Sequence, residues 1–273
     1  MPNIDTHALA REFLDAYETG TVVPAPPSAR YEDFDLTAAY AIETAFMRAR
    51  IERGRKRAGL KVGYANKAVW RALKLETLVW GHMYDDTVHF AGGESAELAL
   101  PYYRSPKVEP EIVLKLKHPI ADGSDATAVL DAVEWLALGF EIIDCPFPDW
   151  QFKPTDFVAA FGLHLGLIVG EPVPVEPDAI PSLVAALPTF KVKLSKGGHL
   201  VEEGSGKNSL RSPALCVAEL SSALIRRGGI DPLGAGDLIS SGTLTTGQPA
   251  AKGDTWRAEL DGLALPSLTL RLG

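Results

Sequence analysis

Three glutamates are the residues of this chain whose type and spacing could support chemistry. Glu109 and Glu111 are two residues apart, and Glu141 follows thirty residues later. Alternate side chains of a β-strand point to the same face, so the first two carboxylates can share a pocket with a third from another strand. Carboxylates in an apolar setting stay ionised only when a cation balances them. Oxygen ligands of this kind suit a hard divalent cation, Mg²⁺ or Mn²⁺.

The commoner interpretation of a Glu-x-Glu pattern is a solvated face at the edge of a sheet. Pro110 stands between the two glutamates and fits only an edge strand or the start of a strand, because proline has no amide hydrogen to donate. Strongly apolar residues flank the pair, however, and segment 138–143 has little other reason to hold the charge of Glu141. No His-x₃-His or cysteine spacing competes for a softer metal. We therefore expect a metal site at all three glutamates.

The hydrophobic pattern predicts the elements that would position these glutamates. Residues 108–117 alternate, which places both Glu109 and Glu111 on the face opposite Ile112. Residues 125–138 have helical spacing and predict an amphipathic helix. A short strand over 139–144 then carries Glu141. The metal site would therefore lie where these two strands meet.

The remaining pattern is one of many strands with interspersed helices. It lacks the regular alternation of a βαβ fold and predicts the α+β class. Glycines at 197 and 198 predict a hairpin turn. The three prolines of segment 22–27 predict an extended connector. The expected helices span 5–19, 36–53 and 213–227, and the expected strands span 165–169, 189–194, 199–202, 237–241 and the region from 253 to the end.

Composition excludes several classes of function. The 273 residues are 46% hydrophobic and 23% charged, as in an ordinary globular protein, and the net charge of −8 argues against a nucleic-acid partner. No apolar run is long enough for a membrane span, and the first residues have no apolar signal core, so a cytoplasmic location is expected. Two cysteines provide no disulfide scaffold. Residues 204–207 are expected to form a flexible loop and not a phosphate site.

Six segments have an order and spacing that are specific when taken together. They are Ala39-Tyr40-Ala41-Ile42-Glu43, Gly59-Leu60-Lys61-Val62-Gly63, Lys107-Val108-Glu109-Pro110-Glu111-Ile112, Glu141-Ile142-Ile143-Asp144, Asp149-Trp150-Gln151-Phe152-Lys153 and residues 235–243. Together they resemble the fumarylacetoacetate hydrolase superfamily, and within it the branch of 2-keto-4-pentenoate hydratases and 4-oxalocrotonate decarboxylases. The resemblance implies a mixed β-roll core behind a helical N-terminal portion, with a helical subdomain over 1–60, a catalytic domain over 61–273, and a homo-oligomer.

The resemblance also implies roles for individual residues. Glu109, Glu111 and Glu141 match the family's Mg²⁺ or Mn²⁺ ligands. Lys61 matches an active-site lysine, and Lys153 matches a second lysine more loosely. Substrate binding is implied for two further residues, Gly242 and Thr243. Asp144 is expected to be a structural hydrogen-bond acceptor.

The implied activity is a hydratase that adds water to a small 2-hydroxydienoate or its 2-keto tautomer in the breakdown of aromatic or cyclic compounds. Such a substrate presents a carboxylate and a neighbouring oxygen that a divalent metal can bind. Three alternatives remain. One is a sister decarboxylase, which needs an additional cationic group for the second carboxylate of its diacid. The others are a C–C bond hydrolase and a catalytically silent partner subunit.

Three departures from the family pattern place the reaction in question while leaving the metal ligands intact. Val79 stands where the hydratases have an active-site aspartate, and residues 159–163 are apolar where a polar motif is usual. Glu43 replaces an expected glutamine. His82 or His164 is a candidate replacement acid or base, because histidine titrates near neutral pH. A histidine near an apolar stretch is more often a packed core residue.

Overall fold

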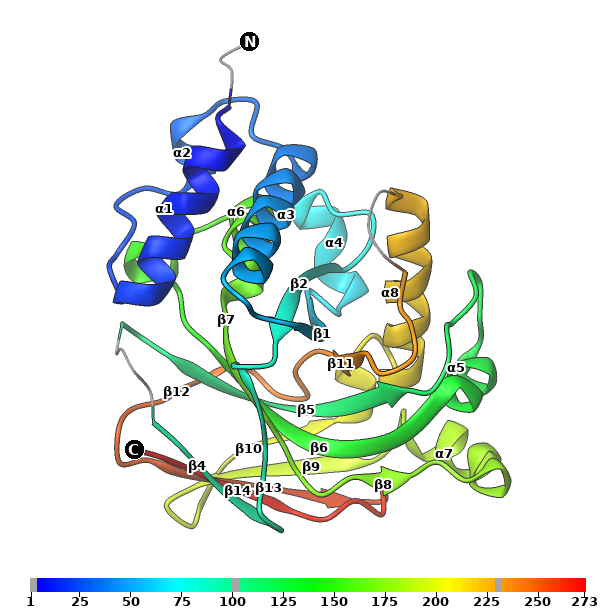
Figure 1. The fold of residues 1–273 in the computed structure, drawn as a ribbon. Coiled ribbons are helices and arrows are strands. Elements are labelled where there is room, and N and C mark those ends of the chain that lie inside the picture. The colour runs from blue at the N-terminus through cyan, green and yellow to red at the C-terminus, as the bar shows by residue number, and fades with distance from the viewer. Residues whose placement is uncertain (1–3, 100–103, 229–231) are drawn as a thin grey trace.

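The computed structural model describes residues 4–99, 104–228 and 232–273. Its strands form two sheets, which Figure 1 shows one below the other. The larger sheet has the order β2 (Val79–Tyr84), β1 (Arg57–Gly63), β11 (Leu238–Ser240), β5 (Lys107–Leu116), β6 (Val133–Ile143), β7 (His164–Val169) and β3 (Val88–Phe90), with β12 (Gln248–Pro249) beside β5 and β8 (Val173–Pro174) beside β6. The smaller sheet has the order β10 (His199–Ser205), β9 (Lys191–Lys196), β13 (Thr255–Asp261), β14 (Leu268–Leu272) and β4 (Ser95–Leu98).

Helices cover one side of the larger sheet. Figure 1 shows the first helices gathered at the N-terminal end, above β1 and β2 and away from the smaller sheet. The predicted α+β class with mixed sheets is confirmed. The helices are α1 (Thr6–Thr19), α2 (Pro27–Arg30), α3 (Leu36–Glu52), α4 (Lys67–Leu73), α5 (Ala126–Ala132), α6 (Pro154–Ala159), α7 (Ile180–Ala186) and α8 (Pro213–Arg227).

Local signals in the sequence set the ends of several helices. The side chain of Asp5 accepts a hydrogen bond from the Ala8 amide at the start of α1, and Gly20 ends that helix with a φ of 71°. Asp35 caps α3 in the same way. Helix α8 has the predicted bounds, and it begins with proline at its first position. These three predicted helices are confirmed to within one residue at each end.

The predicted helix over 125–138 is wrong in its second half. Helix α5 ends at Ala132, and β6 begins at Val133 and runs to Ile143. Ten of the eleven residues of β6 are buried, because both faces of this strand are packed. A strand buried on both faces has a continuous apolar run without alternation, so helical spacing in segment 133–138 was misleading.

The pairing of β5 with β6 places the glutamates. The two strands are antiparallel, and their register sets Glu109 directly opposite Glu141 and Glu111 opposite Gly139. A side chain at Gly139 would collide with Val113, so a glycine is needed for this close approach. The strands therefore bring all three carboxylates to one face of the sheet, as the alternation predicted.

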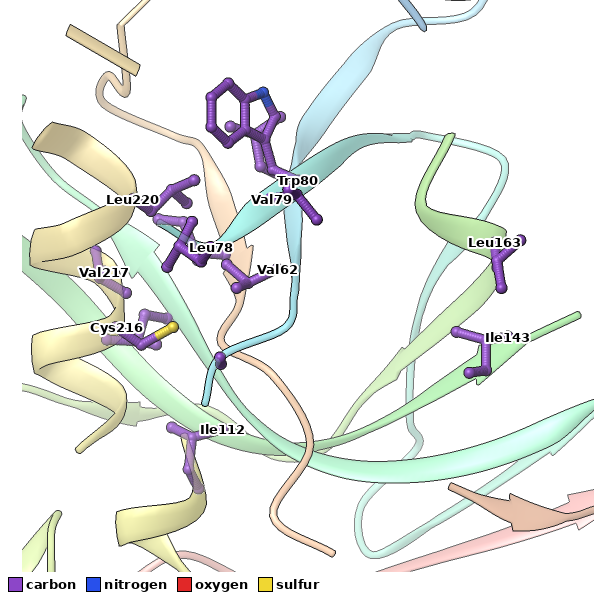
Figure 2. Close-up of a cluster of buried hydrophobic side chains, with 14 of the residues drawn as sticks. Val62, Leu78, Val79, Trp80, Ile112, Ile143, Leu163, Cys216, Val217 and Leu220 are labelled. Atoms are coloured by element: carbon purple, nitrogen blue, oxygen red, sulfur yellow. The ribbon is translucent and has the colours of Figure 1, made fainter. Parts of the chain in front are cut away.

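A hydrophobic core supports this face from behind. Figure 2 shows Cys216, Val217 and Leu220 of α8 pointing toward Val62 of β1 and Leu78, the residue before β2. All five side chains are buried, so α8 packs closely against this part of the sheet. One core cluster extends from the N-terminal helices to the C-terminal strands, so the predicted boundary at residue 60 stays a prediction. Among the described residues, no helix is long and apolar enough to cross a membrane.

Candidate metal centre and active-site cavity

Three carboxylates converge on one point. One oxygen from each of Glu109, Glu111 and Glu141 lies within 4.8 Å of the others. Glu111 and Glu141 are completely buried, and Glu109 is partly buried. Glu111 is held by the Gly242 amide, which donates to its Oε2 at 2.8 Å, and by the Ser240 hydroxyl. Its other oxygen, Oε1, is buried without a hydrogen-bond partner among the described residues.

A buried lysine is the cation next to this cluster. The Nζ of Lys61 lies 2.8 Å from Oε2 of Glu141 and 5.2 Å from the ring centre of Phe157. Gly162 makes room for the lysine stem, since a Cβ at this position would lie 2.6 Å from Cδ of Lys61. Burial by itself lowers the pKa of Lys61, but the charges of the three glutamates outweigh burial and raise the pKa. Lys61 is therefore an ammonium ion at neutral pH.

A histidine holds Glu141 from its other side. Nδ1 of His164 lies 2.8 Å from Oε1 of Glu141, and Nε2 lies 3.0 Å from Oγ1 of Thr87. Burial lowers the pKa of His164, which favours the neutral ring. The neutral ring donates its Nδ1–H to the carboxylate, and the Thr87 hydroxyl beside Nε2 donates to the Tyr84 carbonyl at 3.1 Å. Histidine thus orients the carboxylate.

The charges in the cluster do not balance. Burial raises the pKa of Glu109 to about 7 despite the attraction of Lys61. Burial and repulsion by Glu141 and Glu109 raise the pKa of Glu111 well above its usual range. Burial also acts to raise the pKa of Glu141, but Lys61 and His164 outweigh it and lower the pKa. One ammonium cannot neutralise three carboxylates, so the cluster lacks positive charge.

These observations fit a bound divalent cation. An orphaned carboxylate oxygen, three converging ligands and a deficit of positive charge are what such an ion would correct. The ligand set contains only oxygen, which hard cations prefer. Neighbouring contacts from serine, glycine and histidine orient the carboxylates, as outer partners do at metal sites.

A cavity of about 810 Å³ opens beside the cluster. Eight described non-glycine residues have positive φ, and five of them line this cavity. Such conformations cost about 1 to 3 kcal/mol each and are concentrated at functional sites, so their frequency around the cavity is consistent with a functional role. The five strained residues are Tyr64, Trp150, Leu163, Leu210 and Arg211.

The cavity brings together four of the eight predicted site residues. Lys61, Glu109, Gly242 and Thr243 all line it. The Thr243 hydroxyl donates to the Thr245 carbonyl at 3.0 Å, which fixes its orientation at the cavity wall. The expected substrate-binding turn therefore lies next to the expected metal ligands.

The structure does not bring His82 and Lys153 to this cavity. His82 pairs in register with Leu60, so its side chain is on the opposite face from Lys61, where Nδ1 lies 2.6 Å from Oε1 of Glu43. Lys153 is the N-cap residue of α6, and its exposed side chain borders a separate cavity. Strand alternation explains the first result, because residues adjacent in sequence point to opposite faces.

Asp144 is a structural acceptor, as expected. Its two oxygens accept hydrogen bonds from the Arg104 side chain at 2.5 Å and the Ser105 amide at 3.1 Å. It therefore ties the segment before β5 to the end of β6.

The apolar departures lie behind Lys61. Val79 is buried, and both Val79 and Phe157 face the position of Gly63, the neighbour of Lys61 on the same strand face. Phe161 stacks on Phe46 with ring centres 4.0 Å apart. The wall behind the lysine is consequently apolar, where the hydratase pattern has an aspartate.

Sequence reasoning missed the residues that support the glutamates from other strands. The sequence indicates for His164 either an acid or base or a packed core residue, but not its contact with Glu141. Ser240 was not considered, although it lies in the segment that carries Gly242 and a hydroxyl there is a natural donor to a buried carboxylate. Two cations of the loop after β10, Lys207 and Arg211, also line the cavity.

The chain thus has the fold of a mixed β-sheet that carries three buried or partly buried carboxylates beside a cavity. The model of the fumarylacetoacetate (FAA) hydrolase C-terminal family matches residues 64–270, and the chain belongs to this family. A 2-keto-4-pentenoate hydratase of Paraburkholderia xenovorans is 30% identical over 93% of this chain and 90% of its own length. A 4-oxalocrotonate decarboxylase of a Pseudomonas species is 30% identical over 78% of each chain.

A solved structure supports the same relationship. The 4-oxalocrotonate decarboxylase from Pseudomonas putida G7, complexed with magnesium and adipate, superimposes with a TM-score of 0.88. It is 26% identical, and the alignment covers 100% of this chain and 99% of that chain. The same enzyme complexed with calcium and acetate gives a TM-score of 0.87 at 25% identity. The predicted membership in this superfamily is confirmed.

Proposed function

We propose that this chain is a divalent-metal-dependent lyase that hydrates a small 2-hydroxydienoate or 2-keto-4-enoate in the breakdown of aromatic or cyclic compounds. Relatives at about 30% identity that are named hydratases support the reaction. The observation that carries the proposal is the buried cluster of Glu109, Glu111 and Glu141 with one orphaned oxygen. These residues would hold Mg²⁺ or Mn²⁺, and the magnesium complex of the decarboxylase supports a divalent ion.

When bound, the cation supplies positive charge that polarises the 2-oxo group of the substrate and favours negative charge developing there. The hydroxydienoate loses the proton of its 2-hydroxyl group and gains one at C5, which gives the isomeric conjugated 2-oxo-3-enoate. One water then adds across that double bond, with its hydroxyl on C4 and its hydrogen on C3.

The chain's own residues bind, orient and protonate. In the metal-free protein the three carboxylates raise the pKa of Lys61, so its Nζ carries a proton that can serve as a positive charge for the substrate or be donated to it. The Thr243 hydroxyl and the backbone at Gly242 border the place where a substrate carboxylate would lie. Ile143, Phe157 and Leu163 supply an apolar wall that excludes water from the carbon chain.

The test is the loss of ultraviolet absorbance of 2-hydroxypenta-2,4-dienoate in the presence of Mg²⁺. The wild type should turn over only with metal, and Glu111→Gln should lose at least a hundredfold in kcat/KM because one ligand is neutralised. Glu203→Gln is the matched control, since this glutamate is exposed on β10. Absence of any metal-dependent loss of absorbance would count against hydration.

The rival reactions are distinguished by the acids they consume and the products they release. Release of carbon dioxide from an oxalocrotonate-type diacid identifies the decarboxylase, which the structural match to the Pseudomonas putida enzyme favours as the second candidate. Cleavage of a C–C bond by water identifies a hydrolase, and no turnover with any of these acids identifies a silent partner subunit. A homo-oligomer and a cytoplasmic location remain predictions, and gel filtration tests the first.

A further inference from the structure

A second cavity, of about 1150 Å³, shares no lining residue with the cavity beside the metal centre. It lies between the start of α3, the end of α4, the start of α6 and the end of α8, and Figure 1 shows α4 between α3 and α8. Val79 and Lys153 are both in its wall. Two positions that the family pattern singles out therefore belong to a cavity that the proposed reaction does not use.

The inner wall of this second cavity is apolar and aromatic. Phe34, Leu75 and Leu78 line it and are buried. The rings of Tyr40 and Trp80 lie together in the same wall, with their centres 4.5 Å apart and their planes 36° from parallel. Such a wall favours a ligand with a flat apolar body.

Two polar atoms of the lining residues have no hydrogen-bond partner. Nε1 of Trp80 and Oγ1 of Thr155 are both buried, and neither has a partner among the described residues. Trp80 is only 2% exposed, and its indole nitrogen can donate a hydrogen bond but cannot accept one. A buried donor without an acceptor costs free energy, which an acceptor atom of a bound molecule would recover.

The cavity also has unpaired positive charge. Its lining contains four basic and two acidic side chains. Cζ of Arg227 lies 4.0 Å from the ring centre of Tyr40, so the guanidinium lies over the ring and its N–H groups point outward in its own plane. Within the described part of the chain, neither Arg227 nor Lys153 has a carboxylate within 4.0 Å. These two cations are consequently available to an anion.

We propose that the second cavity binds an aromatic carboxylate, with its ring against Tyr40 and Trp80 and its carboxylate toward the unpartnered donors. An indole N–H, an ammonium and a guanidinium only donate, so the ligand must supply acceptors, and a carboxylate supplies negative charge as well. The apolar wall requires the rest of the ligand to be apolar. This site is independent of the metal and of the proposed hydration, because the two cavities have no lining residue in common.

The experiment titrates three probes, benzoate, benzamide and acetate, into chelator-treated protein in a calorimeter. The wild type should bind one benzoate per chain. Benzamide lacks the charge and acetate lacks the ring, so both should bind at least tenfold more weakly. Benzoate affinity should fall at least tenfold in Lys153→Gln/Arg227→Gln. It should fall about fivefold in Trp80→Phe, which keeps an aromatic ring and removes the N–H.

Two control variants remove the same number of charges elsewhere. Lys191→Gln/Lys193→Gln alters exposed residues of β9, and Lys207→Gln/Arg211→Gln alters the wall of the metal cavity. Neither should change the affinity for benzoate.

Three results would overturn the second site. They are no saturable binding of benzoate to the wild type, equal affinity for the three probes, and unchanged affinity in Lys153→Gln/Arg227→Gln. Both residues of this variant are exposed, so it tests the site even where Trp80→Phe disturbs the packing. Loss of binding in Lys207→Gln/Arg211→Gln would instead place benzoate in the metal cavity, which also overturns the proposal.

Discussion

Neutralising Glu109 should stabilise the metal-free protein at alkaline pH, although this residue is expected to bind metal. The structure raises the pKa of Glu109 from 4.5 to about 7. The folded protein therefore holds this proton more tightly than the unfolded chain does. The stabilisation is fully present below pH 4.5 and is lost as the pH rises through 7. Glu109→Gln mimics the protonated side chain and should not show this loss.

The magnitude follows from the size of the pKa difference. Each unit of pKa corresponds to about 1.4 kcal/mol, so the ionisation of Glu109 should cost the metal-free protein about 3 kcal/mol by pH 8. The entropy of unfolding scales at about 2 cal/mol/K per residue, and 273 residues then convert this energy to about 5 °C in Tm. Glu109→Gln should melt about 5 °C above the wild type at pH 8 and level with it near pH 4.5.

The assay is thermal unfolding of chelator-treated protein across this pH range, followed by the same series in excess Mg²⁺. Metal should reverse the order, because binding stabilises the wild type in proportion to the logarithm of ligand concentration over Kd, while the variant lacks one ligand. Glu203→Gln should follow the wild type throughout. A metal-free Glu109→Gln protein that is no more stable than the wild type at pH 8 would refute the charge deficit derived from the structure.

Three further changes test the neighbours of the cluster. His164→Leu removes the donor to Glu141 and should weaken Mg²⁺ binding 10- to 100-fold in titration calorimetry, whereas His164→Asn retains a donor and should lose less; equal losses would contradict an orienting role. Lys61→Met conserves volume but removes the proton, so kcat should fall by about 10² or more while Mg²⁺ binds at least as tightly, and an unchanged kcat would remove the lysine from the reaction. Gly162→Ala should lower the free energy of unfolding by about 1 to 3 kcal/mol in denaturant titrations, and it should lower kcat because the added Cβ displaces Lys61. Gly123→Ala is the control for backbone strain alone, because Gly123 has a φ of 69° and open space around it.

Much of the local structure could be predicted because its causes are local. Capping residues, turn glycines and strand alternation act within a few residues of themselves, and they correctly placed α1, α3, α8 and the β9–β10 hairpin. The same alternation correctly placed Glu109 and Glu111 on one face of β5. Segment 133–138 was missed because its burial on both faces depends on the sheets and helices packed around it.

The residues of the candidate site can also be divided into those placed by local spacing and those placed by tertiary contacts. Residue spacing alone predicts two carboxylates on one strand face in an apolar setting, which is a ligand set that suits a hard cation. The distant residues that join them cannot be predicted in this way, because strand register and sheet order depend on contacts far apart in the chain. The register of β5 with β6 places Glu141 opposite Glu109, and the register of β1 with β2 places His82 on the other face, near Glu43. The loop after β10 brings Arg211 to the cavity wall. Spacing along β5 places Glu109 and Glu111 together, and the packing of the sheets brings Glu141 and His164 next to them.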